Sequence, residues 1–251
     1  MRLGQLIDQQ QAQIRFLGDT GLLVTFGAAQ DQSNSPDARS LCNKLANKIK
    51  ALLGKAYRDH CFGLRSVALY FDPMLMDESD QDLIARLRAL QLEGSDNAQD
   101  SQQAPKKHLI PLCYEEGLDF QALQQEFNLS KSALIDLHSA CLFDVALLGF
   151  LPGLAYMYGL NPALSCSRLS EPRLKVPKGA VGIAGSMSVI YPQQSPGGWR
   201  IIGRTPYSFF QAEPQPRARL KAGDKVQFYP ISTAEFDQIS AKGSEALCWR
   251  D

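Results

Sequence analysis

Glycine and proline punctuate the segment between Gly149 and Pro206, and this pattern restricts the fold more than any other feature of the chain. The segment holds nine glycines and seven prolines. Proline removes a backbone donor and glycine permits unusual backbone angles, so long helices are disfavoured here. Short apolar runs occur in and around the segment, at residues 143–148, 181–184, 199–202 and 226–229. Many short strands separated by turns predict a β-barrel or a sandwich.

The first third of the chain has a different pattern. Apolar runs at residues 14–17, 22–26 and 66–71 have the length of strands. Apolar residues spaced by three and four predict helices over residues 37–53 and 80–92. Two helices interleaved with about four strands predict a ferredoxin-like domain, with helices layered on one sheet. The whole chain is therefore predicted to be α+β.

A polar run separates the two patterns. Residues 93–107 read EGSDNAQDSQQAPKK and contain no large apolar residue, so they cannot bury enough surface to offset the entropy of ordering. We predict a domain over residues 1–92, a linker over residues 93–107 and a second domain over residues 108–251. The second domain opens with a strand from His108, continues with two short helices, the second capped by Ser130, and closes with a helix that a Ser232–Glu235 capping box begins.

Composition excludes several classes of function. Lys plus Arg and Asp plus Glu number 26 each, so the chain lacks the basic excess typical of nucleic-acid binders. No apolar stretch approaches the ~18 residues of a membrane span, and the N-terminus has no signal-like apolar region, so a cytoplasmic protein is expected. Six cysteines without a C-x-x-C pair predict reduced core thiols, and three scattered histidines predict no metal site.

Three long motifs carry a family resemblance. GFLPGLAYMYGL (residues 149–160), EPRLKVPKGAVGIAG (residues 171–185) and YPQQSPGGWRIIGRTP (residues 191–206) closely resemble the B-subunit family of 5-oxoprolinase, also called KipI or allophanate hydrolase subunit 1. Shorter matches extend the resemblance over nearly the whole chain. It implies a ferredoxin-like N-terminal domain and a cyclophilin-like β-barrel at the C-terminus.

The resemblance also implies a function and partners. Family members join a homologous C subunit directly, and with the A subunit they hydrolyse 5-oxo-L-proline to L-glutamate, with ATP as co-substrate of the complex. The chain alone is then expected to be inactive, and no metal or organic cofactor is indicated in it. Other relatives inhibit a histidine kinase or form the carboxyltransferase part of urea carboxylase. One scaffold hosts all three functions, so these alternatives stay open.

The sequence departs from the family pattern in one loop. Met187, Ser188 and Val189 stand where the family usually has Gln-Thr-Gly, and Lys178 stands where it usually has Ala. A thioether replaces an amide that can donate and accept hydrogen bonds. If this loop lines the substrate pocket, the ligand preference differs from that of the family.

Cationic and polar side chains on the rigid loops are the candidate site. We predict that His138 and Arg173 are catalytic, because a histidine can move a proton during lactam opening and an arginine fork suits a carboxylate. They are predicted to border one cleft with four substrate-binding residues: Lys178, Ser186, Arg204 and Thr205. Loop residues are predicted to shape this cleft: Gly149, Pro152, Gly153, Gly185, Pro196, Gly197 and Gly198. The alternative is that the cations are solvated rim charges and His138 only ends a helix.

Overall fold

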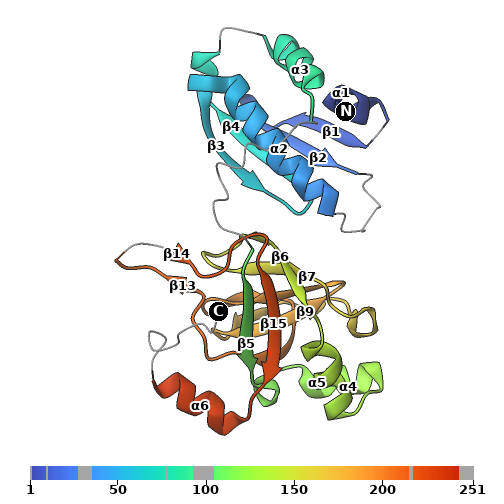
Figure 1. Ribbon diagram of the computed structural model, residues 1–251, viewed down its shortest axis with the longest axis vertical. Helices are drawn as coiled ribbons and strands as arrows, with labels where there is room; N and C mark the ends of the chain where they lie inside the picture. The colour runs from blue at the N-terminus through green and yellow to red at the C-terminus, as the bar shows by residue number, and fades with distance from the viewer. Residues whose placement is uncertain are drawn as a thin grey trace. The chain divides into compact units, whose positions relative to one another are not determined.

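The chain divides into two compact units, Met1–Gln102 and Gln103–Asp251 (Figure 1). The computed structural model describes residues 2–9, 11–27, 36–76, 79–92, 105–214 and 217–242, with only the backbone described for residues 36–40. The predicted linker, residues 93–107, falls largely outside these ranges. The predicted domain boundaries therefore stay a prediction, although the first strand of the second unit already begins at Lys107.

The first unit is built on one antiparallel sheet with the strand order β1-β2-β4-β3. Its strands are β1 (Ala12–Phe16), β2 (Gly21–Phe26), β3 (Tyr57–Phe62) and β4 (Ser66–Phe71). Sequence patterns missed β3, because this edge strand is polar and mostly exposed and so lacks an apolar run.

Helices supply the rest of the core of the first unit. They are α1 (Leu3–Asp8), α2 (Pro36–Leu53) and α3 (Asp80–Ala89), with single 3-10 turns η1 (Gly18–Thr20), η2 (Gly54–Ala56) and η3 (Pro73–Leu75). Leu45 and Ile49 of α2, one helical turn apart, are fully buried with Leu22 and Val24 of β2. The predicted apolar face of α2 is therefore confirmed.

The connectivity of this unit differs from that of a ferredoxin-like domain. A ferredoxin-like chain runs β-α-β-β-α-β, with a helix between its first two strands. Here β1 and β2 form a hairpin joined by η1, and α2 comes only after β2. The segment from β2 through α2 and β3 to β4 does form a split β-α-β unit, because β4 lies between β2 and β3. The unit is thus a helix-covered α+β sheet in which β1 precedes the split unit in sequence.

The second unit is a nearly closed β-barrel. Seven strands follow the order β12-β9-β10-β7-β6-β15-β5, antiparallel except for the pair β5–β15. A bridge between Cys113 and Arg204, with two backbone hydrogen bonds of 2.9 Å, brings the two ends of the sheet together. The strands are β5 (Lys107–Leu112), β6 (Phe143–Leu148), β7 (Ala155–Tyr158), β9 (Ala180–Ala184), β10 (Met187–Ile190), β12 (Arg200–Arg204) and β15 (Lys225–Pro230).

Smaller elements surround the barrel. They are η4 (Tyr114–Glu116), α4 (Phe120–Phe127), α5 (Lys131–Ser139), η5 (Pro162–Leu164), β8 (Arg173–Val176), β11 (Ser195–Gly197), β13 (Phe210–Gln211), β14 (Arg217–Ala218) and α6 (Thr233–Ala241). Both predicted helix caps are confirmed. Ser130 Oγ accepts a hydrogen bond from the Ala133 N–H, and Ser232 and Glu235 form the capping box that begins α6.

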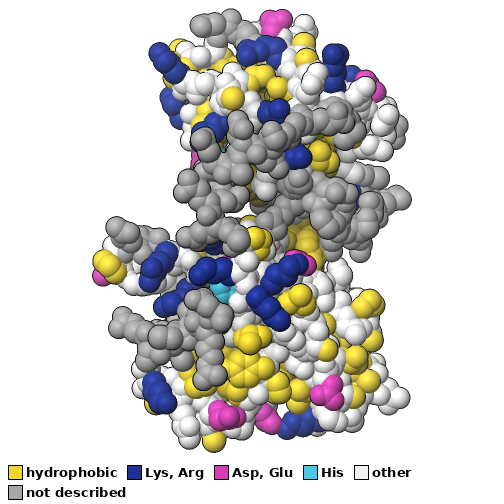
Figure 2. Space-filling view, viewed as in Figure 1, with side chains coloured by type: hydrophobic (Ala, Val, Ile, Leu, Met, Phe, Trp, Pro, Cys, Tyr) yellow, Lys and Arg dark blue, Asp and Glu magenta, His cyan; other side chains and the backbone are white. Residues whose placement is uncertain are grey.

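The cysteine prediction is correct in part. Cys42, Cys113, Cys141 and Cys166 are buried free thiols, whereas Cys61 is exposed on the edge strand β3. Cys248 lies outside the described residues. In the described part of the chain, no helix is both long and apolar enough to cross a membrane. On the face shown in Figure 2, charged side chains of both signs surround an apolar area over β5 and β15.

Candidate functional site

The barrel closes along a seam where backbone lies directly against backbone. Residues 113–119 run beside β12, with Cys113 paired to Arg204 and Asp119 bonded to Ile201. A Cβ on Gly117 would lie 2.4 Å from the carbonyl oxygen of Ile202. Only glycine permits such a contact. The seam, defined here as residues 113–119 and β12, therefore depends on close backbone approach, and it holds most of the charged side chains considered below.

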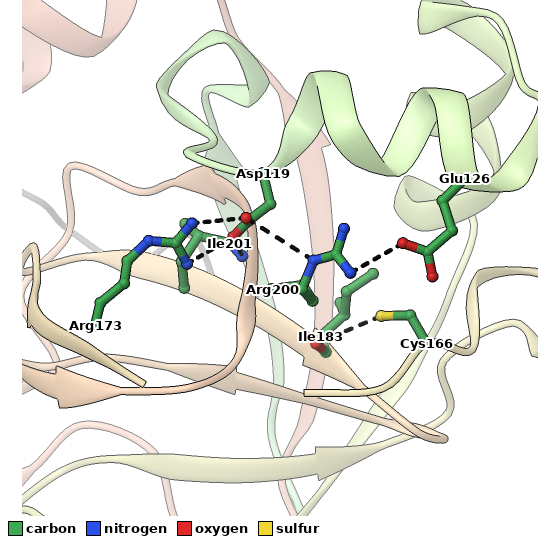
Figure 3. A network of polar contacts seen from close by, with 7 residues as sticks. All are labelled: Asp119, Glu126, Cys166, Arg173, Ile183, Arg200 and Ile201. Carbon is green, nitrogen blue, oxygen red and sulfur yellow. Dashed lines mark hydrogen bonds and ion pairs between the residues drawn. The ribbon is translucent and has the colours of Figure 1, made fainter. Parts of the chain in front are cut away.

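Asp119 is the centre of a buried polar network at one end of the seam (Figure 3). Its carboxylate accepts two hydrogen bonds from Arg173, of 2.7 and 3.0 Å, and a third of 2.6 Å from the Ile201 N–H. Asp119 also precedes α4, where an Asp is usually an N-cap, yet its side chain caps nothing. The carboxylate instead fixes β8, through Arg173, to β12.

Arg200 extends this network toward α4. Its Nη1 forms an ion pair with Glu126 at 2.9 Å, and its Nε lies 3.8 Å from the Asp119 carboxylate. Among the described residues this buried Nε has no hydrogen-bond partner. Figure 3 shows Cys166 beside Arg200, where burial raises the pKa of the Cys166 thiol to about 11. The thiol is therefore protonated near neutral pH.

A second polar group lies at the other end of the seam, around Arg204. Its Nε donates to the carbonyl oxygen of Lys178 at 2.8 Å, its Nη1 lies 3.4 Å from Glu116, and its guanidinium lies 5.2 Å from the centre of the Phe236 ring. The Thr205 N–H donates to the carbonyl of Gly179. The structure thus brings together three of the predicted residues, Lys178, Arg204 and Thr205.

The other predicted residues lie elsewhere. Ser186 follows β9, at the end of this strand opposite to Lys178. Arg173 is in the Asp119 network. His138 lies in the barrel core, stacked on Phe228 with ring centres 5.3 Å apart. A single cleft bordered by all six residues is contradicted at His138, because this side chain is fully buried.

His138 is enclosed by aromatic rings and is fully buried. Its Nδ1 lies 2.9 Å from the Tyr114 hydroxyl, and its Nε2 has no hydrogen-bond partner among the described residues. Burial lowers the pKa of His138 to about 3, so the imidazole is neutral at physiological pH. A substrate cannot reach this ring while α5 and β15 are packed as they are here.

Close contacts explain why glycine occupies two of the predicted loop positions, Gly153 and Gly197. Gly153 has a φ of +82°, and a Cβ there would lie 2.8 Å from the Cβ of Phe210. A Cβ on Gly197 would lie 2.2 Å from the Tyr191 hydroxyl oxygen. Pro196 is the middle residue of β11. The remaining members lie next to β6, β9 and β11, and the fully buried His138 borders no cleft with them: Gly149, Pro152, Gly185 and Gly198.

The loop that departs from the family pattern forms β10, and its side chains pack inside the protein. Ser188 Oγ donates to the carbonyl of Gly182 at 3.1 Å. Val189 is fully buried beside Trp199, and Met187 packs against the same apolar cluster. The altered side chains therefore fill the wall of the barrel.

Chemically, Arg173, which Asp119 of the seam holds in place, can bind a small anion. Arg173 has five N–H donors, and Asp119 takes two of them, while the side chain remains 28% exposed. Arg173 can therefore bind a second carboxylate without releasing the first. Sequence patterns missed Asp119, Glu116 and Glu126, because nothing local marks an acidic residue that pairs with a distant arginine. No group of three or more His, Cys, Asp or Glu suited to a metal ion occurs among the described residues.

The fold and the seam define an α+β protein with a nearly closed barrel, and comparison with known proteins identifies its family. Residues 12–220 match the family model described as carboxyltransferase domain, subdomain C and D. The chain belongs to this family, which supports the resemblance to the B subunit of 5-oxoprolinase.

Two curated relatives carry the name of that B subunit. The chain is 39% identical over 129 residues to the 5-oxoprolinase B subunit of Bacillus subtilis, a match that covers 51% of this chain and 54% of the relative. It is 39% identical over 123 residues to the Escherichia coli O157:H7 protein, covering 48% and 56%. The chain thus spans about half the length of the curated relatives it matches.

Solved structures agree with the fold. The crystal structure of TTHA0988 superposes with a TM-score of 0.68 at 27% identity, over 88% of this chain and 40% of that chain. The urea amidolyase of Kluyveromyces lactis superposes with a TM-score of 0.73 over 93% of this chain and 16% of that chain. At 19% identity, this second likeness concerns the fold alone.

Proposed function

We propose that this chain belongs to a cytoplasmic, ATP-dependent 5-oxoprolinase, in which it acts with the A and C subunits to hydrolyse 5-oxo-L-proline to L-glutamate. The observation that carries the proposal is the 39% identity to proteins named as the B subunit of 5-oxoprolinase. The chemistry is consistent, because a lactam is a stable amide. Transfer of a phosphoryl group from ATP to the amide oxygen would release ADP and make the carbonyl carbon electrophilic. Water would then add to this carbon, the ring C–N bond would break as the nitrogen takes up a proton, and phosphate would be released.

Within this proposal, Arg173 binds the carboxylate of 5-oxoproline. Asp119 holds the guanidinium in place with two charge-assisted hydrogen bonds, so little side-chain entropy remains to be lost on binding. The exposed Lys175 on the same strand, together with Lys178 just beyond it, adds positive charge nearby. His138 is not included among the residues that touch the substrate, because it is fully buried.

Reconstitution tests the proposal. The chain alone, and the chain combined with the purified A and C subunits, would be supplied with 5-oxo-L-proline and ATP, and glutamate and ADP would be measured. We expect turnover only when all three proteins are present. Equal turnover in a mixture of the A and C subunits without this chain would contradict the proposal, as would full activity of this chain alone.

The role of Arg173 has its own test in the reconstituted complex. Arg173→Lys keeps the charge but loses the planar fork, and should raise KM about tenfold or more, since a hydrogen bond to a charged group contributes about 1.5–3 kcal/mol. Lys175→Ala on the same strand is the matched control and should change KM less than about threefold. An unchanged KM in Arg173→Lys, with the complex intact, would remove Arg173 from the binding site.

A second candidate function is supported by a separate observation. The family model is that of a carboxyltransferase domain, and 78 residues are 32% identical to yeast urea amidolyase. A carboxyltransferase component would act on an amide or urea with a carboxylated carrier. Carboxylation of urea by the chain in the presence of a carboxylated biotin carrier, without activity on 5-oxoproline, would favour this function over the first.

A further inference from the structure

Among the residues that the structure describes, the parallel strands β5 and β15 carry exposed apolar side chains on part of their outer face. Parallel strand pairs are normally covered on both faces, because the connections that they require pack over them. The inner face of this pair meets the rule, since Ile110, Leu112, Val226 and Phe228 are buried in the barrel core. The outer face carries exposed apolar side chains (Figure 2).

The strand register places these side chains next to one another. On the outer face the exposed Leu109 lies opposite Gln227, and the buried Pro111 lies opposite Tyr229. On the other side of β15, Val226 pairs with Phe143, the first residue of β6, and Leu142 directly precedes this strand. Leu109 is 45% exposed, Leu142 44% and Tyr229 40%. We call these three residues the β5–β15 patch.

Charges of opposite sign lie at the two ends of this patch. At the start of the strands, Lys107 lies opposite Lys225, and the nearby Lys106 and Lys221 are also exposed. Asp144 pairs with Lys225 there, and Asp224 is buried, so the described residues at this end comprise four lysines and two carboxylates. Figure 2 shows Lys and Arg side chains gathered on one side of the apolar area over β5 and β15.

Carboxylates follow the other end of the strands. β5 leads into Glu115 and Glu116 of η4, and β15 leads into α6, where Glu235 and Asp237 are exposed. Lys131 pairs with Glu115 and Arg204 with Glu116, so the carboxylates outnumber their cations. Because β5 and β15 are parallel, both strands contribute the same sign to each end.

We propose that the β5–β15 patch is a contact between two copies of this chain, related by a two-fold axis perpendicular to the strands. Such an axis places the basic end of one copy against the acidic end of the other, and the apolar centre against itself. A surface that is apolar in the middle and complementary in charge at its ends meets the requirement of self-complementarity for a two-fold contact. The contact is separate from the Arg173 site and does not depend on the proposed function.

Analytical ultracentrifugation of the full chain over a wide concentration range tests this contact. The parent is expected to show a reversible monomer–dimer equilibrium. Tyr229→Ser and Leu109→Ser should each weaken dimerisation about tenfold or more, because each removes apolar area from the centre of the contact. Leu174→Ser is the matched control, since Leu174 is 85% exposed on β8, outside the patch, and should leave the equilibrium unchanged.

A charge exchange distinguishes the loss of this contact from a general effect of the substitutions on folding. Lys107→Glu alone should weaken the dimer, and adding Asp237→Lys in the same chain should restore it, because both ends of the contact are then inverted together. A parent that stays monomeric at high concentration would overturn the proposal, as would a dimer that none of these variants affects. A stable complex with a different protein that Leu109→Ser abolishes would assign the patch to that partner instead.

Discussion

Within the seam, Asp119 makes more polar contacts than any other side chain. It joins Arg173 on β8 and the Ile201 N–H on β12, and it lies near Arg200. Taking away one member of a buried ion pair leaves an uncompensated charge, which costs more than the pair itself contributes. The stability of this part of the barrel therefore depends strongly on one carboxylate.

Asp119→Ala is expected to lower the free energy of unfolding by about 2–4 kcal/mol, because two arginines lose their buried partner. Urea unfolding followed by circular dichroism measures the change. Glu115→Ala is the control, because Glu115 forms an exposed pair with Lys131 that contributes about 1 kcal/mol or less. Equal effects of the two substitutions would show that the Asp119 network is not a main source of stability.

His138 gives the protein a specific dependence on pH. The pKa of His138 is about 3 in the folded chain and about 6.5 when unfolded, so the unfolded state binds the proton more readily. The contribution of the neutral ring to the free energy of unfolding is complete above pH ~6.5. It falls by at most ~1.4 kcal/mol per pH unit as the pH drops toward 3.

His138→Phe should remove this part of the acid sensitivity. The loss of stability between about pH 6.5 and 4.5 should be smaller in His138→Phe than in the parent, when each is measured by urea unfolding. The same slope in the parent and in His138→Phe would contradict the assignment.

At the scale of elements, the two backbones of the seam lie so close together at Gly117 that no side chain fits between them. Gly117 has a φ of −78°, which any residue can adopt, so only its contact with the Ile202 carbonyl requires glycine. The whole of residues 113–119 would have to move away from β12 to accommodate a side chain. Barrel closure and the placement of Asp119 are therefore coupled.

Gly117→Ala is expected to destabilise the chain by about 1–3 kcal/mol or more, since the Cβ would overlap with backbone that cannot rotate away. Gly149→Ala is the matched control, because a Cβ there would meet only the Leu147 side chain at an ordinary 3.5 Å. The thermal midpoints of the two variants provide the measurement. A Gly117→Ala variant as stable as Gly149→Ala would show that the seam can open without cost.

At the scale of the whole molecule, the two units have separate hydrophobic cores. One core contains Leu22, Leu45 and Leu69, and the other contains Ile110, Phe143 and Phe228. A unit with its own core can fold alone. The apolar residues that each unit needs are therefore supplied from within its own part of the sequence.

Limited proteolysis should first cut within residues 93–107, the predicted linker, and should leave two folded pieces. The reason is compositional, since this run contains no large apolar residue that could hold it in a core. Mass spectrometry of the fragments locates the cut, and circular dichroism of each separated fragment reports its folding. First cleavage inside the barrel, between Val181 and Trp199, would contradict the predicted boundary.

The sequence alone determined the features that depend on residues close together in the chain. The caps at Ser130 and Ser232 and the buried face of α2 follow from contacts within a few residues, and the glycines and prolines after Gly149 predicted the short strands of the barrel. The predicted ferredoxin-like connectivity differs from the observed one, because β3 has no apolar run and the partner of β1 depends on how the sheet assembles.

Only the tertiary structure decided the site. Arg173 and Asp119 are 54 residues apart and meet because the barrel closes, and no local pattern marks such a pair. His138 resembles an exposed helix end in sequence, but the packing of α5 against β15 buries it completely. Burial and long-range pairing arise from the assembled core, so the sequence predicted which side chains carry charge, and the fold determined which of them a ligand can reach.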